Sequence, residues 1–262
     1  MPPALRRAQI LDRVRRDGGA SVADLARALE VSPITIHRDL ELLAADGLLE
    51  RVHGGARARE GAGADGGHTP VATAWDQRVE LAKAAKERIA VHAARYVTAG
   101  ETVFLDASST SLALARHLMQ APPTELTVVT NSPAIAHEIA AESIHVVVTP
   151  GELDQHMRLL AGRWTNEFLA TLNLAVAFVS AAGITVEQGL TTSRRPVADV
   201  IAAARASARR TVALLDASKF GRTSLLSIMR AEEADAIVTD PDLPPEEVER
   251  YRRARINLEV AA

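Results

Sequence analysis

Residues 21–56 read SVADLARALEVSPITIHRDLELLAADGLLERVHGGA, and this stretch decides the fold of the amino-terminal part of the chain. Ser21 with Asp24 three residues later resembles a capping box, and apolar positions follow it at helical spacing. After a short turn, Ser32 can cap the free amides of a further helix, and Pro33 suits the first position of that helix. The stretch therefore predicts two short helices joined by a tight turn.

The second of these helices has an apolar face made by Ile36, Leu40 and Leu43, and it has polar side chains near its start. This arrangement is the one that places a helix in the major groove of DNA, and the strand and glycine turn expected over residues 48–56 would form a wing beside it. A packing module that does not bind DNA stays an open alternative. On the DNA-binding hypothesis, the candidate contact residues are Ser32, Thr35, His37, Arg38, Arg51 and His53.

A preceding helix is expected over residues 7–16, because Ile10, Leu11 and Val14 recur at helical spacing and Gly18 can end the helix in a left-handed conformation. Residues 1–59 carry ten basic side chains against eight acidic ones, whereas the rest of the chain carries 20 against 25. This asymmetry favours an amino-terminal end that faces DNA. The net charge of the whole chain is -3, which disfavours a third hypothesis, a structural DNA-packing protein.

The Gly- and Ala-rich segment over residues 60–73 has no hydrophobic period, so we place a domain boundary there. The expected organisation is a DNA-binding domain at 1–58, a linker at 59–75 and a larger domain at 76–262. In the larger domain short apolar runs alternate with helical patterns, which predicts an α/β fold with a largely parallel sheet, helices on both faces, and ligands at the carboxyl ends of the strands. Strands are expected at Thr102–Leu105, Leu126–Val129, His145–Thr149, Ala175–Ser180, Thr211–Leu215 and Ala236–Val238, and helices at Ser111–Met119, Pro133–Ala141, Leu159–Leu172, Val197–Arg209 and Pro245–Arg255.

The composition excludes several classes of protein. The chain has 262 residues, 47% of them hydrophobic, and no cysteine, which excludes a disulfide framework, a thiolate metal site and a cysteine nucleophile. No stretch approaches the roughly 20 apolar residues that cross a bilayer, and the start of the chain has no signal-peptide core. We therefore expect a cytoplasmic protein that does not bind membranes. The histidines show no paired spacing for metal ligands, so neither a metal nor a cofactor is expected.

Polar residues follow three of the expected strands. Asp106, Ser108, Ser109 and Thr110 lie where a strand ends and a helix begins, so amides and hydroxyls converge where the helix dipole favours an anion. Capping of the helix by the same hydroxyls is the open alternative, and for Asn131 after the next strand two roles stay open, binding of ligand hydroxyls or stabilisation of a turn. Lys219, in the segment Asp216-Ala217-Ser218-Lys219, also follows a strand and could neutralise a phosphate or carboxylate.

The segment 31–56 resembles the signature of the DeoR family of bacterial regulators, and the resemblance continues through LDASSTS (105–111), VVTNS (128–132), PGELD (150–154), AAGITVEQGLTTS (181–193), LLDASKFGR (214–222) and IVTD (237–240). It implies a winged helix-turn-helix domain followed by a sensor domain that shares the fold of ribose-5-phosphate isomerase. It also implies a repressor of sugar or related carbon metabolism genes whose effector is a phosphorylated sugar or a similar anion. The effector-binding residues that it implies are Asp106, Ser108, Ser109, Thr110, Asn131, Gly183 and Lys219.

Three positions depart from the family pattern. His37 stands where the family usually has arginine, Ser108 where it usually has glycine, and Ile201 near a usual lysine, so the operator sequence and the orientation of the effector do not transfer. A sugar-phosphate isomerase with an appended DNA-binding domain is the alternative function. The isomerases have acidic residues in the loop that here reads SAAGI (180–184), and alanine cannot move protons, so we interpret the domain as a binding module.

One short helix per chain gives little contact with bases, and paired half-sites multiply that contact. We therefore expect a homo-oligomer, a dimer or a tetramer, that binds double-stranded DNA.

Overall fold

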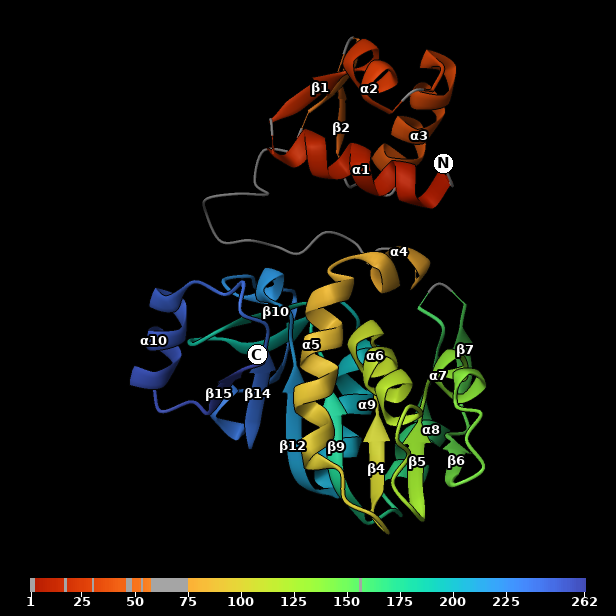
Figure 1. Cartoon of the computed structure of the whole chain (residues 1–262), viewed down its shortest axis with the longest axis vertical. Helices are drawn as coiled ribbons and strands as arrows, with labels where there is room; N and C mark the ends of the chain where they lie inside the picture. Colours follow the sequence, from red (N-terminus) through yellow and green to blue (C-terminus); the bar gives the residue numbers. More distant parts are fainter. Residues whose placement is uncertain are drawn as a thin grey trace. The chain divides into compact units, whose positions relative to one another are not determined.

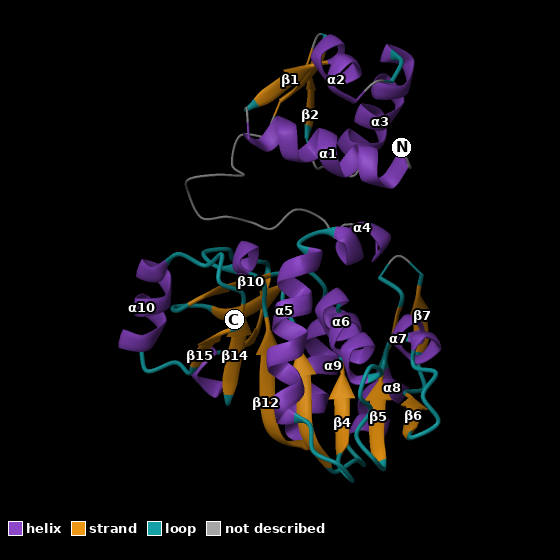
Figure 2. Ribbon diagram, in the orientation of Figure 1, coloured by secondary structure: helices purple, strands orange, loops and turns teal. Residues whose placement is uncertain are grey.

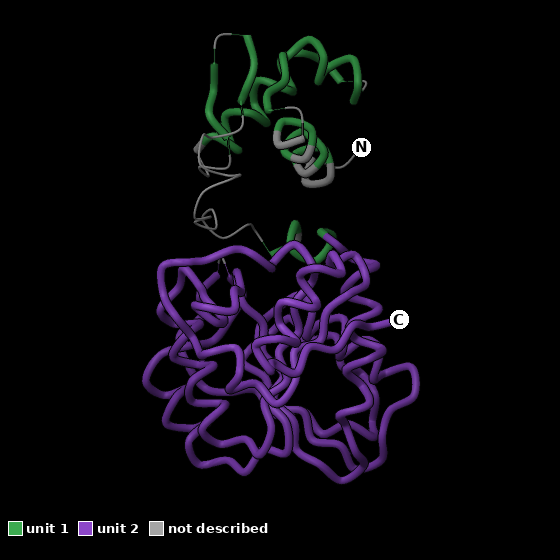
Figure 3. Tube along the Cα trace, turned by 90° about the vertical axis from the view of Figure 1, so that its left-hand side faces the viewer, with its two compact units in different colours: residues 1–81 green, residues 82–262 purple. Residues whose placement is uncertain are grey.

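A computed structural model of the chain describes residues 3–16, 18–29, 31–45, 49–52, 54–57, 75–155 and 157–262. The chain divides into two compact units, Met1–Leu81 and Ala82–Ala262, which Figure 3 shows in separate colours. Within the described residues, every helix is too short or too polar to cross a membrane.

The first unit contains a winged helix-turn-helix fold. Gly18 has a φ of 73°, the left-handed conformation expected at the end of the first helix. Ser21 Oγ accepts a hydrogen bond from the amide of Asp24 at 3.1 Å, which confirms the predicted cap. A small antiparallel sheet in the order β1-β3-β2 makes the wing; the sequence did not predict its first strand. The elements are α1 (Pro3–Arg16), β1 (Gly19–Ser21), α2 (Val22–Leu29), α3 (Pro33–Ala45), β2 (Glu50–Val52), β3 (Gly55–Arg57) and α4 (Trp75–Glu80).

The core of this unit consists of aliphatic side chains from α1, α2 and α3, as the helical spacing predicted, together with Leu49 and Ala56. Beside it lies a buried ion pair that the sequence analysis did not foresee. Arg6 Nε of α1 donates to Asp39 Oδ2 of α3 at 2.5 Å, and the Asp39 side chain is only 4% exposed. The pair therefore fixes α3 against α1. The buried core residues are Ile10, Leu11, Val14, Val22, Leu25, Ala26, Ile36, Leu40, Leu43, Leu49 and Ala56.

The second unit is built on a seven-stranded, fully parallel sheet in the order β15-β14-β12-β9-β4-β5-β6. Figures 1 and 2 show helices on both faces, with α5 and α6 on one face and α8 and α9 on the other. The predicted α/β fold is confirmed. The sheet strands are β4 (Thr102–Leu105), β5 (Leu126–Thr130), β6 (Ile144–Val148), β9 (Leu174–Val179), β12 (Ala208–Leu214), β14 (Ala236–Thr239) and β15 (Leu258–Val260).

The helices around this sheet are α5 (Lys83–Ala93), α6 (Ser109–Leu118), α7 (Pro133–Glu138), α8 (Arg163–Leu169), α9 (Arg195–Ala206) and α10 (Pro245–Arg253), with the short 3-10 turns η1 (Ala94–Tyr96), η2 (Ala217–Lys219) and η3 (Ala231–Glu233). Beside the main sheet lie a hairpin and a small antiparallel sheet. The hairpin is β7 (Glu152–Asp154) with β8 (Leu159–Ala161), and the small sheet is β10 (Gly183–Thr185), β11 (Gly189–Thr192) and β13 (Leu226–Met229).

Several predicted helix ends were wrong. The helix expected over Pro133–Ala141 ends at Glu138, and the helix expected over Leu159–Leu172 ends at Leu169. Residues 159–161 of the helix expected over Leu159–Leu172 form strand β8, because Gly162 takes a φ of 105° and α8 begins only at Arg163. The helix expected over Val197–Arg209 stops at Ala206, because the chain from Ala208 pairs with β9 and starts β12. At β8 and β12 tertiary strand pairing overrides a sequence that favours helix.

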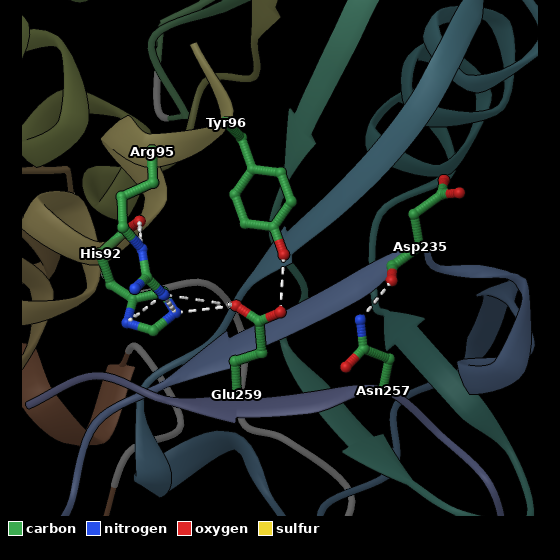
Figure 4. A network of polar contacts seen from close by, with 6 residues as sticks. All are labelled: His92, Arg95, Tyr96, Asp235, Asn257 and Glu259. Atoms are coloured by element: carbon green, nitrogen blue, oxygen red, sulfur yellow. Dashed lines mark hydrogen bonds and ion pairs between the residues drawn. The ribbon is translucent and has the colours of Figure 1, made fainter.

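The last strand, β15, is held by a network of polar contacts around Glu259 (Figure 4). Tyr96 donates its hydroxyl proton to Glu259 Oε1 at 2.7 Å, and His92 Nε2 donates to Oε2 at 2.7 Å. Burial and the bond to Glu259 raise the pKa of Tyr96 to about 12. Partial burial acts to raise the pKa of Glu259, but the hydrogen bonds from His92 and Tyr96 outweigh it and the pKa is lowered. The network therefore ties the end of the chain to α5 and η1.

Candidate functional site

One face of α3 points away from the core of the first unit. Positions 34, 37, 38 and 41 follow the spacing of one helical face and are all exposed, whereas Ile36, Leu40 and Leu43 on the other side are buried. We call Ile34, His37, Arg38 and Glu41 the outward face of α3. It contains two of the predicted DNA contacts, His37 and Arg38, and two residues that were not among the predicted contacts, Ile34 and Glu41.

Ser32 and Thr35, two further predicted contacts, bond to each other at the start of α3. Ser32 Oγ accepts from the Thr35 amide at 3.3 Å, and the two hydroxyl oxygens lie 2.8 Å apart. Ser32 therefore acts as the cap of α3, as its sequence position predicted.

Arg51, on wing strand β2, is bonded to the outward face of α3. Its NH1 atom donates to Glu41 Oε1 at 2.9 Å, and its NH2 atom lies 3.0 Å from His37 Nδ1. A guanidinium has no acceptor, so His37 Nδ1 must be the acceptor of this bond and the proton of the neutral ring is on Nε2. His53, the remaining predicted contact, lies outside the described residues.

Arg38 differs from Arg51. It is exposed and forms no hydrogen bond or ion pair with any residue in the described part of the chain. Its five donors are therefore available to an acceptor outside the protein.

The strand order of the second unit puts most candidate effector residues at one place. The chain runs from β4 outward to β5 and β6, returns to β9 on the other side of β4, and then continues through β12 and β14. The side on which successive strands are added therefore changes between β4 and β9, although the strands remain parallel. Parallel α/β sheets bind ligands at such a point, outside the carboxyl ends of the strands. Asp106 follows β4 and Ser180 follows β9, so these two residues meet at this point.

Asp106 links the loops on either side of this point. Its Oδ2 accepts from the amide of Ser180 at 2.8 Å, and its Oδ1 accepts from Ser111 Oγ at 2.6 Å and from the Ser108 amide at 3.2 Å. Burial raises the pKa of the Asp106 carboxyl above its ordinary value, although the bonds from these three serines act in the opposite direction. Ser180 Oγ in turn donates to the carbonyl of Leu214, at the end of β12, at 2.8 Å.

The predicted hydroxyls at the start of α6 have different roles. Ser108 Oγ accepts from the Ser111 amide at 3.0 Å, so it caps the helix. Ser109 is half-buried and Thr110 is buried. Of these three hydroxyls, that of Ser109 is the best placed to reach a ligand, because it lies in the first turn and is accessible.

Asn131, at the end of β5, is tied to the β8 hairpin. Its Nδ2 atom donates to the carbonyl of Leu160 at 3.0 Å. Its Oδ1 atom is buried without a hydrogen-bond partner among the described residues. A buried acceptor without a hydrogen bond costs folding free energy. A donor on a ligand or a water molecule would satisfy such an atom.

Gly183 is needed for packing. A Cβ at this position would lie 2.4 Å from the carbonyl oxygen of Arg222, so the backbone of residues 183 and 222 approach each other as only glycine allows. Ile201 is 1% exposed and belongs to the apolar stripe of α9. The departure from the family pattern at Ile201 thus lies in the core.

Lys219 lies in η2, the turn after β12. Two carboxylates hold this turn: Asp216 Oδ1 accepts from the Ser218 amide at 3.1 Å, and Asp240 Oδ1 accepts from the Ala217 amide at 2.7 Å. The lysine is thus carried by a turn fixed to the ends of both β12 and β14.

Lys86 of α5 was not predicted from the sequence as a buried charged residue, yet it is only 5% exposed. Arg88 of the same helix lies 4.0 Å from Asp240 at the end of β14, so this part of α5 lies near the carboxyl edge of the sheet. Lys86 shares the buried stripe of Ala85, Ile89 and Ala90. A lysine in an apolar helical period was the signal that could have found it, since buried lysines are rare unless they have partners.

Comparisons with known proteins give a consistent result. Residues 6–61 match the family model of the DeoR-like helix-turn-helix domain, and residues 82–241 match that of the DeoR C terminal sensor domain. The chain is 32% identical over 260 residues to the HTH-type transcriptional regulator GlpR of Haloferax volcanii, which covers 98% of each chain. It is 28% identical to the glycerol-3-phosphate regulon repressor of Escherichia coli, with 96% of each chain covered. Ribose 5-phosphate isomerase A from Neisseria gonorrhoeae matches 55% of each chain with a TM-score of 0.40 and 18% identity.

Proposed function

The chain belongs to the DeoR family of DNA-binding transcriptional regulators, and from this premise we propose that it represses genes of sugar or related carbon metabolism under the control of a phosphorylated sugar or a similar small anion. It is a regulator rather than an enzyme. The name of the Escherichia coli relative, a glycerol-3-phosphate regulon repressor, supports both repression and a phosphorylated metabolite.

We assign DNA reading to residues 1–58 and base contact to the outward face of α3. Arg38 offers free donors, and His37 offers its Nε2–H, because Arg51 occupies the other ring nitrogen. Arg51 thus positions His37, and Ser32 and Thr35 stabilise the start of the helix that carries both readers. Such donors suit the acceptors of guanine in the major groove.

We assign effector binding to residues 76–262, at the carboxyl ends of four neighbouring strands in the order β12-β9-β4-β5. The observation that carries this proposal is the change in the order of the strands at β4 and β9: β5 and β6 follow on one side of β4, and β9, β12 and β14 on the other. Asp106 joins the loops after β4 and β9 by its bond to Ser180. The first turn of α6 and Ser109 supply neutral donors, Asn131 supplies a buried acceptor, and Lys219 supplies positive charge. Asp106, whose carboxylate already accepts three bonds, holds the loop in place.

Calorimetry with a panel of phosphorylated and unphosphorylated sugars tests the effector assignment. We expect the wild type to bind a phosphorylated sugar, and Lys219→Ala to bind it about tenfold or more weakly, because a hydrogen bond to a charged group is lost. Arg209→Ala is the matched control, since Arg209 is exposed near the start of β12, at the opposite edge of the sheet. Equal affinity of the wild type and Lys219→Ala, or a preference for neutral sugars, would refute the anion site.

We also propose that the protein is a dimer or a tetramer, because two half-sites multiply the small base contact of a single α3. Light scattering at micromolar concentration, with and without DNA, measures this directly. A monomer under both conditions would refute the proposal.

A further inference from the structure

Ile34 is the most exposed large hydrophobic side chain in the described part of the chain, at 81% exposure. A folded protein gains free energy by removing such a side chain from water. Exposure at this level leaves nearly all of that gain available to a binding partner.

The surroundings of Ile34 are polar. It is the second residue of α3 and lies one turn before His37 and Arg38 on the outward face, beside the Ser32–Thr35 hydroxyl pair. Two other apolar residues of α3 are exposed: Pro33, directly before Ile34, and Leu42, which is 46% exposed and lies two turns further along the helix. Ile34 is therefore a large apolar side chain, with only Pro33 beside it, on a helical face that is otherwise polar, and not part of an extended apolar patch of the kind that marks a protein interface.

The major groove of DNA matches this combination. Its base edges present hydrogen-bond acceptors and donors together with one apolar group, the C5 methyl of thymine. Recognition helices contact base edges with the residues at their amino-terminal end, where Ile34 lies. Thymine is thus the base that an isolated aliphatic side chain at this position can distinguish.

We propose that Ile34 is a specificity-determining residue that packs against the C5 methyl of a thymine in each operator half-site. The inference rests on the proposed function, since it requires that α3 enters the major groove. The proposal adds a base preference to the recognition of the operator by α3, namely a thymine next to the base pair that His37 or Arg38 contacts.

Replacement of thymine by deoxyuridine tests the proposal, because it removes the C5 methyl and leaves every hydrogen-bonding group in place. The probe is a duplex selected from a random DNA pool by the wild-type full-length protein, and each thymine is replaced in turn. Anisotropy titrations at fixed salt measure the dissociation constants. We expect one replacement per half-site to weaken wild-type binding by about fourfold, the effect of one buried methyl group.

The variant Ile34→Ala should bind the thymine and uracil probes equally at that position. Leu42→Ala is the matched control and should keep the wild-type preference, since Leu42 is also an exposed aliphatic residue of α3 but lies beyond the first turns. Both replaced side chains are exposed, so neither change removes a core residue.

Two results would overturn the inference: no thymine at which uracil weakens wild-type binding, or an Ile34→Ala variant that keeps the full preference. A change of oligomeric state in Ile34→Ala, seen by light scattering with the thymine preference intact, would likewise overturn it in favour of a contact between proteins. Failure of the wild type to select any sequence from the pool would instead refute the proposed function itself.

Discussion

Arg38 is the residue on which DNA binding should depend most. It is exposed on the outward face of α3 without a partner among the described residues, so its guanidinium can donate two bonds to a guanine. Arg38→Ala should weaken operator binding by about 1–3 kcal/mol, measured by anisotropy at fixed salt. Arg27→Ala, which removes an exposed arginine of α2 that pairs with Asp24, serves as the control. Equal losses in the two variants would show that Arg38 contributes only general positive charge.

Asp39, the next residue, should matter for stability instead. Its side chain is 4% exposed and accepts from Arg6, which is itself only 12% exposed. Asp39→Asn removes the buried negative charge that faces both Arg6 and Arg7, and we expect a loss of about 3 kcal/mol in the free energy of unfolding measured in urea. Asp24→Asn, in the exposed pair with Arg27, should cost well under about 1 kcal/mol. Similar losses in the two variants would show that the buried pair contributes no more to the stability than the exposed pair does.

For α3, the sequence predicted which side chains are buried and which are exposed, but not the contacts that the exposed side chains make. Helical periodicity separated Ile36 and Leu40 from His37 and Arg38, because that separation is a property of one helix. The contact between Arg51 and His37 joins α3 to β2, so no local pattern contains it. Ile34 was not singled out from the sequence, although the same helical period places position 34 on one face with His37 and Arg38.

Among the elements, α6 depends on its cap. Ser108 Oγ accepts from the Ser111 amide at 3.0 Å, so Ser108→Ala should lower the free energy of unfolding by about 1 kcal/mol. Ser108→Gly introduces the residue that the family usually has here. It should lower the free energy of unfolding by only a few tenths of ~1 kcal/mol, because glycine is tolerated at the cap position. Urea unfolding of the two variants makes the comparison. A glycine variant as unstable as the alanine variant would count against the cap as the main role of Ser108.

Strand β15 depends on the Glu259 network in a pH-dependent way. The folded state lowers the pKa of Glu259, so its contribution to stability is present above the ordinary carboxyl pKa of about 4.3 and is lost as the pH falls through the lowered value. Glu259→Gln should therefore reduce the urea midpoint at pH 7, and the difference from the wild type should shrink below about pH 4. Glu249→Gln, an exposed glutamate of α10, is the control. A difference that stays constant with pH would exclude the charge of Glu259 as its cause.

The elements themselves were predictable where burial is continuous. The strands β4, β5, β9 and β14 were found within a residue or so at each end, because strands covered on both faces are nearly unbroken apolar runs. The strand β15 was missed because it is short and has a glutamate at its centre. The hairpin strand β8 was assigned to a helix, since three apolar residues fit either period and only pairing with β7 decides between them.

At the scale of the whole molecule, alternating strands and helices predicted the α/β class but not the strand order. The strand order determines which loops meet. Because β9 lies beside β4, on the side away from β5, it brings together residues as far apart in the chain as Asp106 and Ser180. The individual candidate residues could be named from the sequence, because each follows an apolar run that predicts a strand. Their common position depends on parallel pairing between distant strands, which local patterns do not encode.

The last prediction concerns coupling between the two ligands of the proposed repressor. If an effector lowers operator affinity by some factor, thermodynamic linkage requires that operator DNA lowers effector affinity by the same factor, typically about 5- to 150-fold. We expect calorimetry of the sugar phosphate with and without bound operator to give the same ratio as anisotropy of the operator with and without the sugar phosphate. The Arg209→Ala variant should keep this ratio, whereas Lys219→Ala should need a higher effector concentration to reach it. An effector that binds the sensor domain but changes neither affinity would contradict the proposed control of DNA binding, because a ligand shifts an equilibrium only by its difference in affinity for the two states.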